Sequence, residues 1–171
     1  MRSNVRQLLR SSLLLLLLIQ SAAHSDNDTP VKAAIIFNFF KFIEWPAEVM
    51  DQEKFILCVN GESDSNEGLQ ALDGKVVNGK PITVRQQQKA LSTCHMVYLE
   101  ESRASVMRDL TSYPVVTVSS SSDFLDQGGM IALVPEHDHL GFEINQGLAV
   151  EKRIRISALL LKLAISVRSV R

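Results

Sequence analysis

The side chains that could do chemistry are few, and none stands in an established catalytic pattern. Glu100 and Glu101 could share acid and base roles, but acidic residues are equally expected at the start of a helix, where they stabilise its positive end. The serine run 119–122 lacks the G-x-S-x-G turn that exposes a nucleophile. His137 and His139 have no third ligand nearby. The sequence therefore predicts no catalytic residue and no metal site.

Patterns for nucleotide or nucleic-acid binding are also missing. Neither G-x-G-x-x-G nor the Walker pattern occurs, and the polar segment 60–65 offers one glycine beside two acidic residues. His95 has no visible aspartate or nucleophile partner. The charge balance, 18 Lys and Arg against 19 Asp and Glu, gives no bulk attraction to nucleic acid. We expect no cofactor, no nucleic-acid partner and no enzyme activity.

The beginning of the chain has the character of a secretory signal peptide. Arginines at positions 2, 6 and 10 precede an unbroken apolar run over residues 13–19, and small residues follow at 21–23. The run is shorter than a bilayer requires, so a retained membrane anchor is the weaker alternative. We expect a signal peptide over residues 1–23 and a single exported, mildly acidic domain over residues 24–171.

Export would place the two cysteines in an oxidising compartment. Cys58 lies inside the first expected strand and Cys94 at the start of the third, and these strands are neighbours in the common doubly wound order. A bridge is geometrically possible, and two buried free thiols are the alternative. There is no C-x-x-C pattern, so a redox catalyst is not indicated.

The elements that would position these side chains alternate between strands and helices. Short apolar runs predict strands over residues 55–60, 82–86, 95–99, 115–118, 130–134 and 140–144, with helices over 66–72, 102–110 and 123–127. This alternation favours a three-layer α/β/α sandwich with a mostly parallel open sheet. Residues 134–140 are few enough to make the last two strands an antiparallel edge hairpin.

Two longer helices are expected at the ends of the exported domain. Residues 30–44 predict a helix with a broad apolar face and a polar stripe of Asn38, Lys41 and Glu44, with Phe37 and Trp45 on or beside that stripe. Residues 154–167 carry apolar side chains at helical spacing and predict a last helix that docks on the sheet.

Several stretches together resemble the YfiR family of periplasmic proteins. They are residues 38–46 (NFFKFIEWP), 57–59, 74–82, 94–95, 128–131, 142–145 and 155–160, in order along nearly the whole exported chain. The resemblance implies a regulator without catalysis that binds the periplasmic part of an inner-membrane diguanylate cyclase and inhibits it, which lowers cyclic-di-GMP and biofilm formation. An outer-membrane lipoprotein would relieve the inhibition by capturing the regulator.

The same resemblance implies an α/β/α sandwich, a homodimer and a bridge between Cys58 and Cys94. Some relatives sit beside sensor kinases, so a sensor kinase is an alternative membrane partner. Relatives with a second cysteine pair differ from this chain, which has two cysteines in all. Redox sensing that depends on two bridges is therefore not implied here.

Two sets of residues are candidates for partner binding. Phe37, Phe40 and Trp45 are hypothesised to form an exposed or half-exposed aromatic patch, the alternative being that Trp45 caps the core and Phe40 lies under the sheet. Glu143 and Asn145 should face away from the core, either as a docking surface or as an ordinary solvated strand face. A small-ligand sensor is the rival function, and it predicts a closed apolar pocket near the strand ends.

Overall fold

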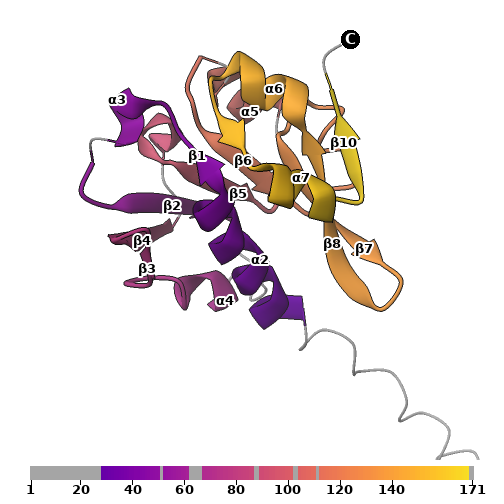
Figure 1. The fold of residues 1–171 in the computed structure, drawn as a ribbon, viewed down its shortest axis with the longest axis horizontal. Coiled ribbons are helices and arrows are strands. Elements are labelled where there is room, and N and C mark those ends of the chain that lie inside the picture. The colour runs from indigo at the N-terminus through magenta and orange to yellow at the C-terminus, as the bar shows by residue number, and fades with distance from the viewer. Residues whose placement is uncertain are drawn as a thin grey trace, which may run out of the picture.

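The structure, a computed structural model, describes residues 28–50, 52–61, 67–86, 89–101, 104–110 and 112–169. The expected signal peptide, residues 1–23, lies outside the described residues. Eight strands form one sheet in the order β10-β8-β7-β6-β5-β2-β4-β3 (Figure 1). Their bounds are β2 (Phe55–Asn60), β3 (Val76–Val77), β4 (Lys80–Gln86), β5 (Met96–Leu99), β6 (Val116–Ser119), β7 (Ile131–Glu136), β8 (His139–Asn145) and β10 (Ser166–Arg168).

The sheet is mostly parallel, as expected. Strand β2 pairs in parallel with β4 and β5, and β5, β6 and β7 continue in parallel. Strands β7 and β8 form the expected antiparallel hairpin. This hairpin is not the edge of the sheet, however, because β10 pairs in parallel with β8 and places Ser166 opposite Glu143. The prediction of the edge strand is therefore wrong: residues 140–144 belong to β8, and β10 is the edge strand.

Helices cover both faces and make three layers. On one face lie α2 (Asp28–Phe42), α4 (Glu67–Gln70), α6 (Gln146–Glu151) and α7 (Ala158–Leu163), and on the other lie α5 (Ala104–Leu110) and the 3-10 helix η3 (Leu91–Thr93). Side chains alternate between the faces along each strand. In β2, for example, Leu57 joins the cluster under α2, whereas Cys58 joins the cluster under α5.

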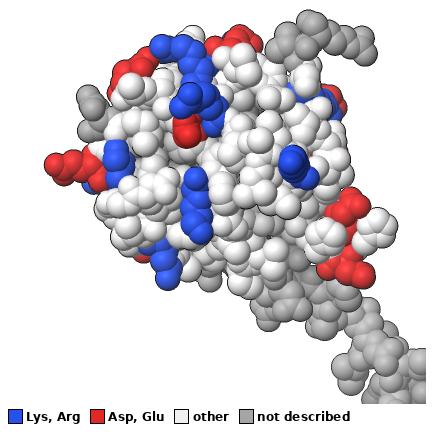
Figure 2. Space-filling model, in the orientation of Figure 1, with Lys and Arg blue, Asp and Glu red and all other residues white. Residues whose placement is uncertain are grey.

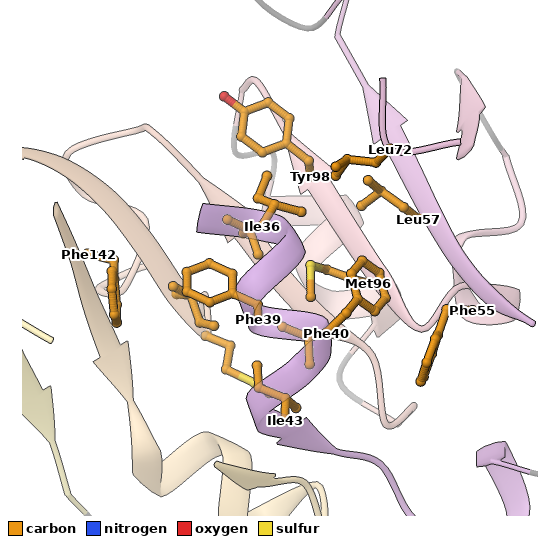
Figure 3. Packing of buried hydrophobic residues seen from close by; sticks show 14 of the residues in the cluster. Ile36, Phe39, Phe40, Ile43, Phe55, Leu57, Leu72, Met96, Tyr98 and Phe142 are labelled. Carbon is orange, nitrogen blue, oxygen red and sulfur yellow. The ribbon is translucent and has the colours of Figure 1, made fainter. Parts of the chain in front are cut away.

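The larger core is built on α2, as Figure 3 shows. Phe39 points from this helix toward Phe142 of β8, at 5.2 Å between ring centres, and Phe40 lies beside Met96 of β5. Phe39, Phe40 and Met96 are fully buried. The predicted polar stripe of Asn38, Lys41 and Glu44 is exposed. The helix ends at Phe42, because the chain continues as β1 (Ile43–Glu44), which pairs with β9 (Arg155–Ile156).

The expected last helix over residues 154–167 is wrong. The chain instead forms β9, a short α7 and then β10. Ser157 interrupts the helix because its side chain caps α7 by accepting a hydrogen bond from the amide of Leu160 at 3.2 Å. Ile165 and Val167 also fit the two-residue period of a strand, so the apolar spacing was ambiguous.

The expected helix over residues 123–127 is also wrong, since residues 122–128 form turns. Gly128 has a φ of 88°, the left-handed conformation that glycine adopts without strain. Helix α4 is shorter than the expected 66–72. Helix α5 begins at Ala104, and the first two residues of the expected helix over 102–110 lie outside the described residues. The short helices α3 (Ala47–Met50) and α6 were not expected.

Candidate functional site

A crevice opens at the carboxyl ends of the parallel strands β5 and β6. Its volume is about 520 Å³, and it is lined by Lys32, Tyr98, Glu100, Glu101, Ser120, Ser121, Asp123 and Gln127. The strand order reverses nearby, because β2 has β4 on one side and β5 on the other. In open α/β sheets, ligands bind at such carboxyl ends, beside the point where the order reverses.

A chain of hydrogen bonds runs along one wall of the crevice. The ammonium of Lys32, from the first turns of α2, donates to the hydroxyl of Tyr98 at 3.0 Å and lies 4.9 Å from the centre of its ring. The Tyr98 hydroxyl in turn lies 3.2 Å from the hydroxyl of Ser120. Figure 3 shows the Tyr98 hydroxyl pointing away from the packed side chains around α2. Lys32 is only 7% exposed, so its charge is held largely inside the protein.

Asp123 is an exposed member of the lining. Its carboxylate accepts hydrogen bonds from the hydroxyl of Ser121 at 2.9 Å and from the side-chain amide of Gln127. These two bonds, together with its own backbone amide, lower the pKa of Asp123 below its usual value. The carboxylate is therefore ionised at neutral pH. The crevice is open and polar, unlike the closed apolar pocket expected of a small-ligand sensor.

The structure brings residues that the sequence singled out separately into this one crevice. Glu100 and Glu101 follow β5, and the serine run follows β6, so neighbouring parallel strands deliver both segments to the same edge. Lys32 and Asp123 were not singled out. Lys32 is 66 residues from Tyr98 in sequence, but it lies four and seven residues before the fully buried Ile36 and Phe39. This spacing places Lys32 on the apolar face of α2, and it is the signal that could have found the residue.

The proposed exposed aromatic patch is wrong for two of its three residues. Trp45 is 5% exposed and Phe40 is fully buried, and their stacked rings are 5.7 Å apart. The helical projection placed Trp45 beside the polar stripe, but α2 ends at Phe42, and β1 carries Trp45 back into the core. The alternative, that Trp45 caps the core, describes the structure. Phe37 is half-buried on α2, with the Lys41 ammonium 5.4 Å from its ring centre.

His95 is a buried structural side chain next to Trp45. Its Nδ1 accepts a hydrogen bond from the amide of Ile56 at 3.1 Å, which leaves the proton on Nε2 to be donated to the carbonyl of Val49 at 3.2 Å. Burial lowers the pKa of His95, the nearby Lys80 charge acts in the same direction, and the Val49 carbonyl opposes them. The neutral ring thus joins α3 to the central sheet.

A disulfide joins Cys58 and Cys94, as the resemblance implied, with a Cα–Cα distance of 6.0 Å. Both residues are buried in the cluster under α5. Glu143 and Asn145 alternate with buried neighbours on β8 and are half-buried. The Asn145 side chain accepts a hydrogen bond from the Leu148 amide at 3.0 Å and caps α6, which gives this residue a structural role.

The most exposed apolar side chains near the end of the chain form a surface that the sequence did not predict. Leu159 and Leu163 of α7 are 53% and 62% exposed, and Ile165 and Val167 are exposed beside them. We call these four residues the α7–β10 surface. Figure 2 shows few charged side chains around α7. The apolar side chains of this surface were expected to pack on the sheet, because the sequence predicted one continuous helix over residues 154–167. Large exposed apolar groups are typical of surfaces that contact other proteins.

Within the ranges that the structure covers, no group of three or more His, Cys, Asp or Glu side chains could hold a metal ion. Across those same ranges, no helix combines the length and the apolar character needed to cross a membrane.

Comparisons with known proteins agree with this fold. A solved structure of a conserved domain protein from Vibrio cholerae O1 biovar El Tor is similar, with a TM-score of 0.56 and 12% identity over 82% of this chain. At that identity the likeness shows the fold alone, and the aligned part spans 60% of that protein. No curated protein matches. A family model described as YfiR/HmsC-like matches residues 29–165, which is most of the chain, and the protein therefore belongs to the YfiR/HmsC-like family.

Proposed function

We propose that this protein is a periplasmic regulator that binds the periplasmic part of an inner-membrane diguanylate cyclase and inhibits it. Inhibition would lower cyclic-di-GMP and biofilm formation. The family match over residues 29–165 is the observation that carries the proposal. The proposal includes a signal peptide over residues 1–23 and a single exported domain over residues 24–171.

The mechanism requires binding and no chemistry. A cyclase with active and inactive arrangements is shifted toward the inactive one by as much as the regulator's affinity for the two arrangements differs. The regulator needs a rigid surface that fits only one arrangement. The disulfide on one face of the sheet and the aromatic packing of Trp45 on the other support such a rigid body.

The α7–β10 surface is the docking site in this proposal. Strand β10 ends the strand order, so one side of its backbone is open to pair with an extended segment. Leu163 and Val167 would contact alternate apolar side chains of that segment. We therefore assign an extended, apolar segment of the cyclase as the occupant. Phe37 and Glu143 retain exposed area and stay in the proposed contact set, whereas Phe40, Trp45 and Asn145 would act by supporting the fold.

The resemblance adds three partners to the proposal. They are a second copy of the chain in a homodimer, an outer-membrane lipoprotein that relieves inhibition, and a sensor kinase as the alternative to the cyclase. Each would meet the exported domain in the same compartment.

The test is deletion of the gene followed by measurement of cellular cyclic-di-GMP and surface attachment. We expect both to rise, and wild-type protein supplied in trans should lower them again. Leu163→Asp, in the α7–β10 surface, should fail to restore the low level. Val76→Asp is the matched control, because Val76 is equally exposed, at 61%, but lies on β3 at the opposite edge of the sheet. An unchanged or lower cyclic-di-GMP level after deletion would overturn the proposal.

A further inference from the structure

The short helix α3 is held against the sheet by side chains from other parts of the chain. In Figure 1 it lies at the outer end of the fold, and in sequence it stands between β1 and β2. None of its residues is fully buried, although Val49 and Met50 pack on the cluster that contains Trp45 and Phe55. The position of α3 therefore depends strongly on the polar contacts that other elements make with it.

The first of these contacts is the imidazole of His95, and it forms only while the ring is neutral. Nδ1 accepts a hydrogen bond from the amide of Ile56 at 3.1 Å, and Nε2 donates to the carbonyl of Val49 at 3.2 Å. A protonated ring carries a hydrogen on both nitrogens and has no acceptor. The Nδ1 hydrogen would then face the Ile56 amide, which can only donate. The ring must turn away, and it loses its bond to Val49.

Two further contacts hold α3, and neither compensates for a charged His95. Lys80 of β4 donates to the carbonyl of Met50 at the end of α3. Its positive charge opposes protonation of His95, so a charged ring would in turn repel Lys80. Glu48 of α3 forms an ion pair with Arg153 at 2.5 Å, but both side chains are more than half exposed, where such pairs contribute little to stability.

Among the residues that the structure describes, no carboxylate contacts the His95 ring. The neighbouring strands β2, β5 and β6 carry no charged residue. The charged side chains on the segments next to α3 and on the turn and strand that lead into β9 are exposed, and they are Glu44, Glu48, Glu53, Lys54, Arg153 and Arg155. His95 itself is 1% exposed. A proton on the enclosed ring is therefore left without a partner, whereas a ring that has turned outward can be hydrated.

We propose that α3 is an acid-released cover: protonation of His95 detaches residues 47–50 and opens the core to water beside Trp45 and Phe55, while the sheet stays folded. The centre of the His95 ring lies 5.8 Å from that of Trp45 and 5.3 Å from that of Phe55, so a ring that turns away uncovers both. This release goes beyond cyclase inhibition. It is measured on the purified protein alone, so its failure leaves the proposed function unaffected.

A single proton limits the size of the effect. Burial lowers the pKa of His95 in the closed form, so the ring takes up its proton more readily once α3 has left. With an ordinary histidine pKa of about 6.5 in the released form and a neutral ring in the closed form, the ratio of released to closed protein rises by up to about thirtyfold between pH 7.5 and pH 5.

Hydrogen exchange on the purified protein tests the release. The amides of Val49 and Met50 donate to the carbonyl of Pro46 at 2.9 and 3.2 Å, and a detached single turn does not keep such bonds in water. We expect their protection factors to fall by about ten- to thirtyfold from pH 7.5 to pH 5, while the amides of β5 exchange at least about tenfold more slowly at both pH values. Equal protection of α3 at the two pH values, or exchange of α3 and β5 at one rate, would overturn the proposal.

Trp45 gives a second measurement, because it is the one tryptophan in the sequence. Acrylamide should quench its fluorescence more strongly at pH 5 than at pH 7.5. His95→Gln keeps a donor and an acceptor without titrating and should remove this difference, whereas His137→Gln, in an exposed turn, should retain it. A His95→Gln protein that keeps the pH dependence of the wild type would overturn the proposal.

The ring of His95 can also be followed in the wild type, so the test stands even where His95→Gln does not fold. Its titration in NMR spectra should coincide with the change in Trp45 quenching. A ring that titrates while the quenching stays constant would show that α3 does not depend on the charge of His95, and would overturn the proposal.

Discussion

The indole nitrogen of Trp45 donates a hydrogen bond of 2.8 Å to the backbone carbonyl of His95, which lies 50 residues further along the chain. The indole ring also contacts Phe40 of α2 and Phe55 of β2, at 5.7 and 5.5 Å between ring centres. Trp45 therefore joins the C-terminal end of α2 to β2 and to His95, the residue before β5. This arrangement makes the residue part of the fold and takes it out of reach of a docking partner.

Replacing Trp45 with Ala should lower the free energy of unfolding by about 3–5 kcal/mol, because a buried aromatic side chain is lost and a cavity remains. Trp45→Phe should cost about 1–2 kcal/mol, mainly because the His95 carbonyl loses one of its two donors and keeps only the Val116 amide. Phe37→Ala, at a half-buried ring on α2, should cost about 1 kcal/mol. Urea unfolding monitored by circular dichroism measures all three. A Trp45→Ala protein as stable as the wild type would contradict the buried position of this side chain.

Stability should fall as the pH drops below about 6.5, the ordinary pKa of histidine, because of His95. The folded protein holds this ring neutral, with Nδ1 accepting from the Ile56 amide, whereas the unfolded chain binds a proton in that range. The unfolded state thus binds more protons, and the free energy of unfolding decreases with falling pH. The stabilisation from the neutral His95 ring is fully present above the pKa that this residue has in the unfolded state. It is lost as the pH falls toward the lower pKa that His95 has in the folded state.

Melting temperatures measured from pH 7.5 to pH 5 would check this dependence on His95. His95→Gln retains a donor and an acceptor but does not titrate, so its profile should be flatter than that of the wild type. His137→Gln is the control, because His137 lies in the exposed turn between β7 and β8. Parallel profiles for the wild type and His95→Gln would assign the pH dependence to other groups.

The central strands could be predicted from the sequence because buried parallel strands are continuous apolar runs. Residues 55–60 match β2 at both ends, and the other five expected strands agree with β4, β5, β6, β7 and β8 within a few residues. The short strands β1, β3, β9 and β10 were not expected. The end of the chain could not be predicted, since residues 154–167 satisfy a helical period and, from Ile165 onward, a strand period too. Ser157 decides the outcome through a local cap that breaks the helix.

The candidate site could be predicted only in part from the sequence. The strand order brings the segments after β5 and β6 together, and this order follows from the expected doubly wound topology. The burial of Lys32 depends on how α2 is rotated on the sheet. The spacing of Lys32 from Ile36 and Phe39 places it on the apolar side of α2, but its contact with Tyr98, 66 residues away, cannot be read from that spacing.

Reducing the disulfide should lower the free energy of unfolding by about 4 kcal/mol, by the chain-entropy estimate for a loop of this length. The sequence separation of Cys58 and Cys94 is 36, and both sulfurs are buried beneath α5. Reductant should therefore act slowly on the folded protein and strongly during unfolding. Urea curves with and without dithiothreitol would measure the effect, and Cys58→Ala with Cys94→Ala should match the reduced wild type. Identical curves with and without reductant would show that the bridge does not contribute to stability.

Two glycine substitutions should differ although they add the same methyl group. At Gly129 an added Cβ would come within 3.0 Å of several ring carbons of Phe124, whose ring is fully buried in the cluster under α5. The ring cannot move without disturbing that cluster, so Gly129→Ala should cost about 1–3 kcal/mol. At Gly141 the added group would meet the tip of Ile165, which is exposed and can adopt another rotamer. Gly141→Ala should therefore cost less than about 1 kcal/mol. Thermal unfolding of the two variants measures this difference. An equal loss of stability in both would contradict the prediction, because it would mean that the Ile165 side chain cannot move aside any more easily than the Phe124 ring.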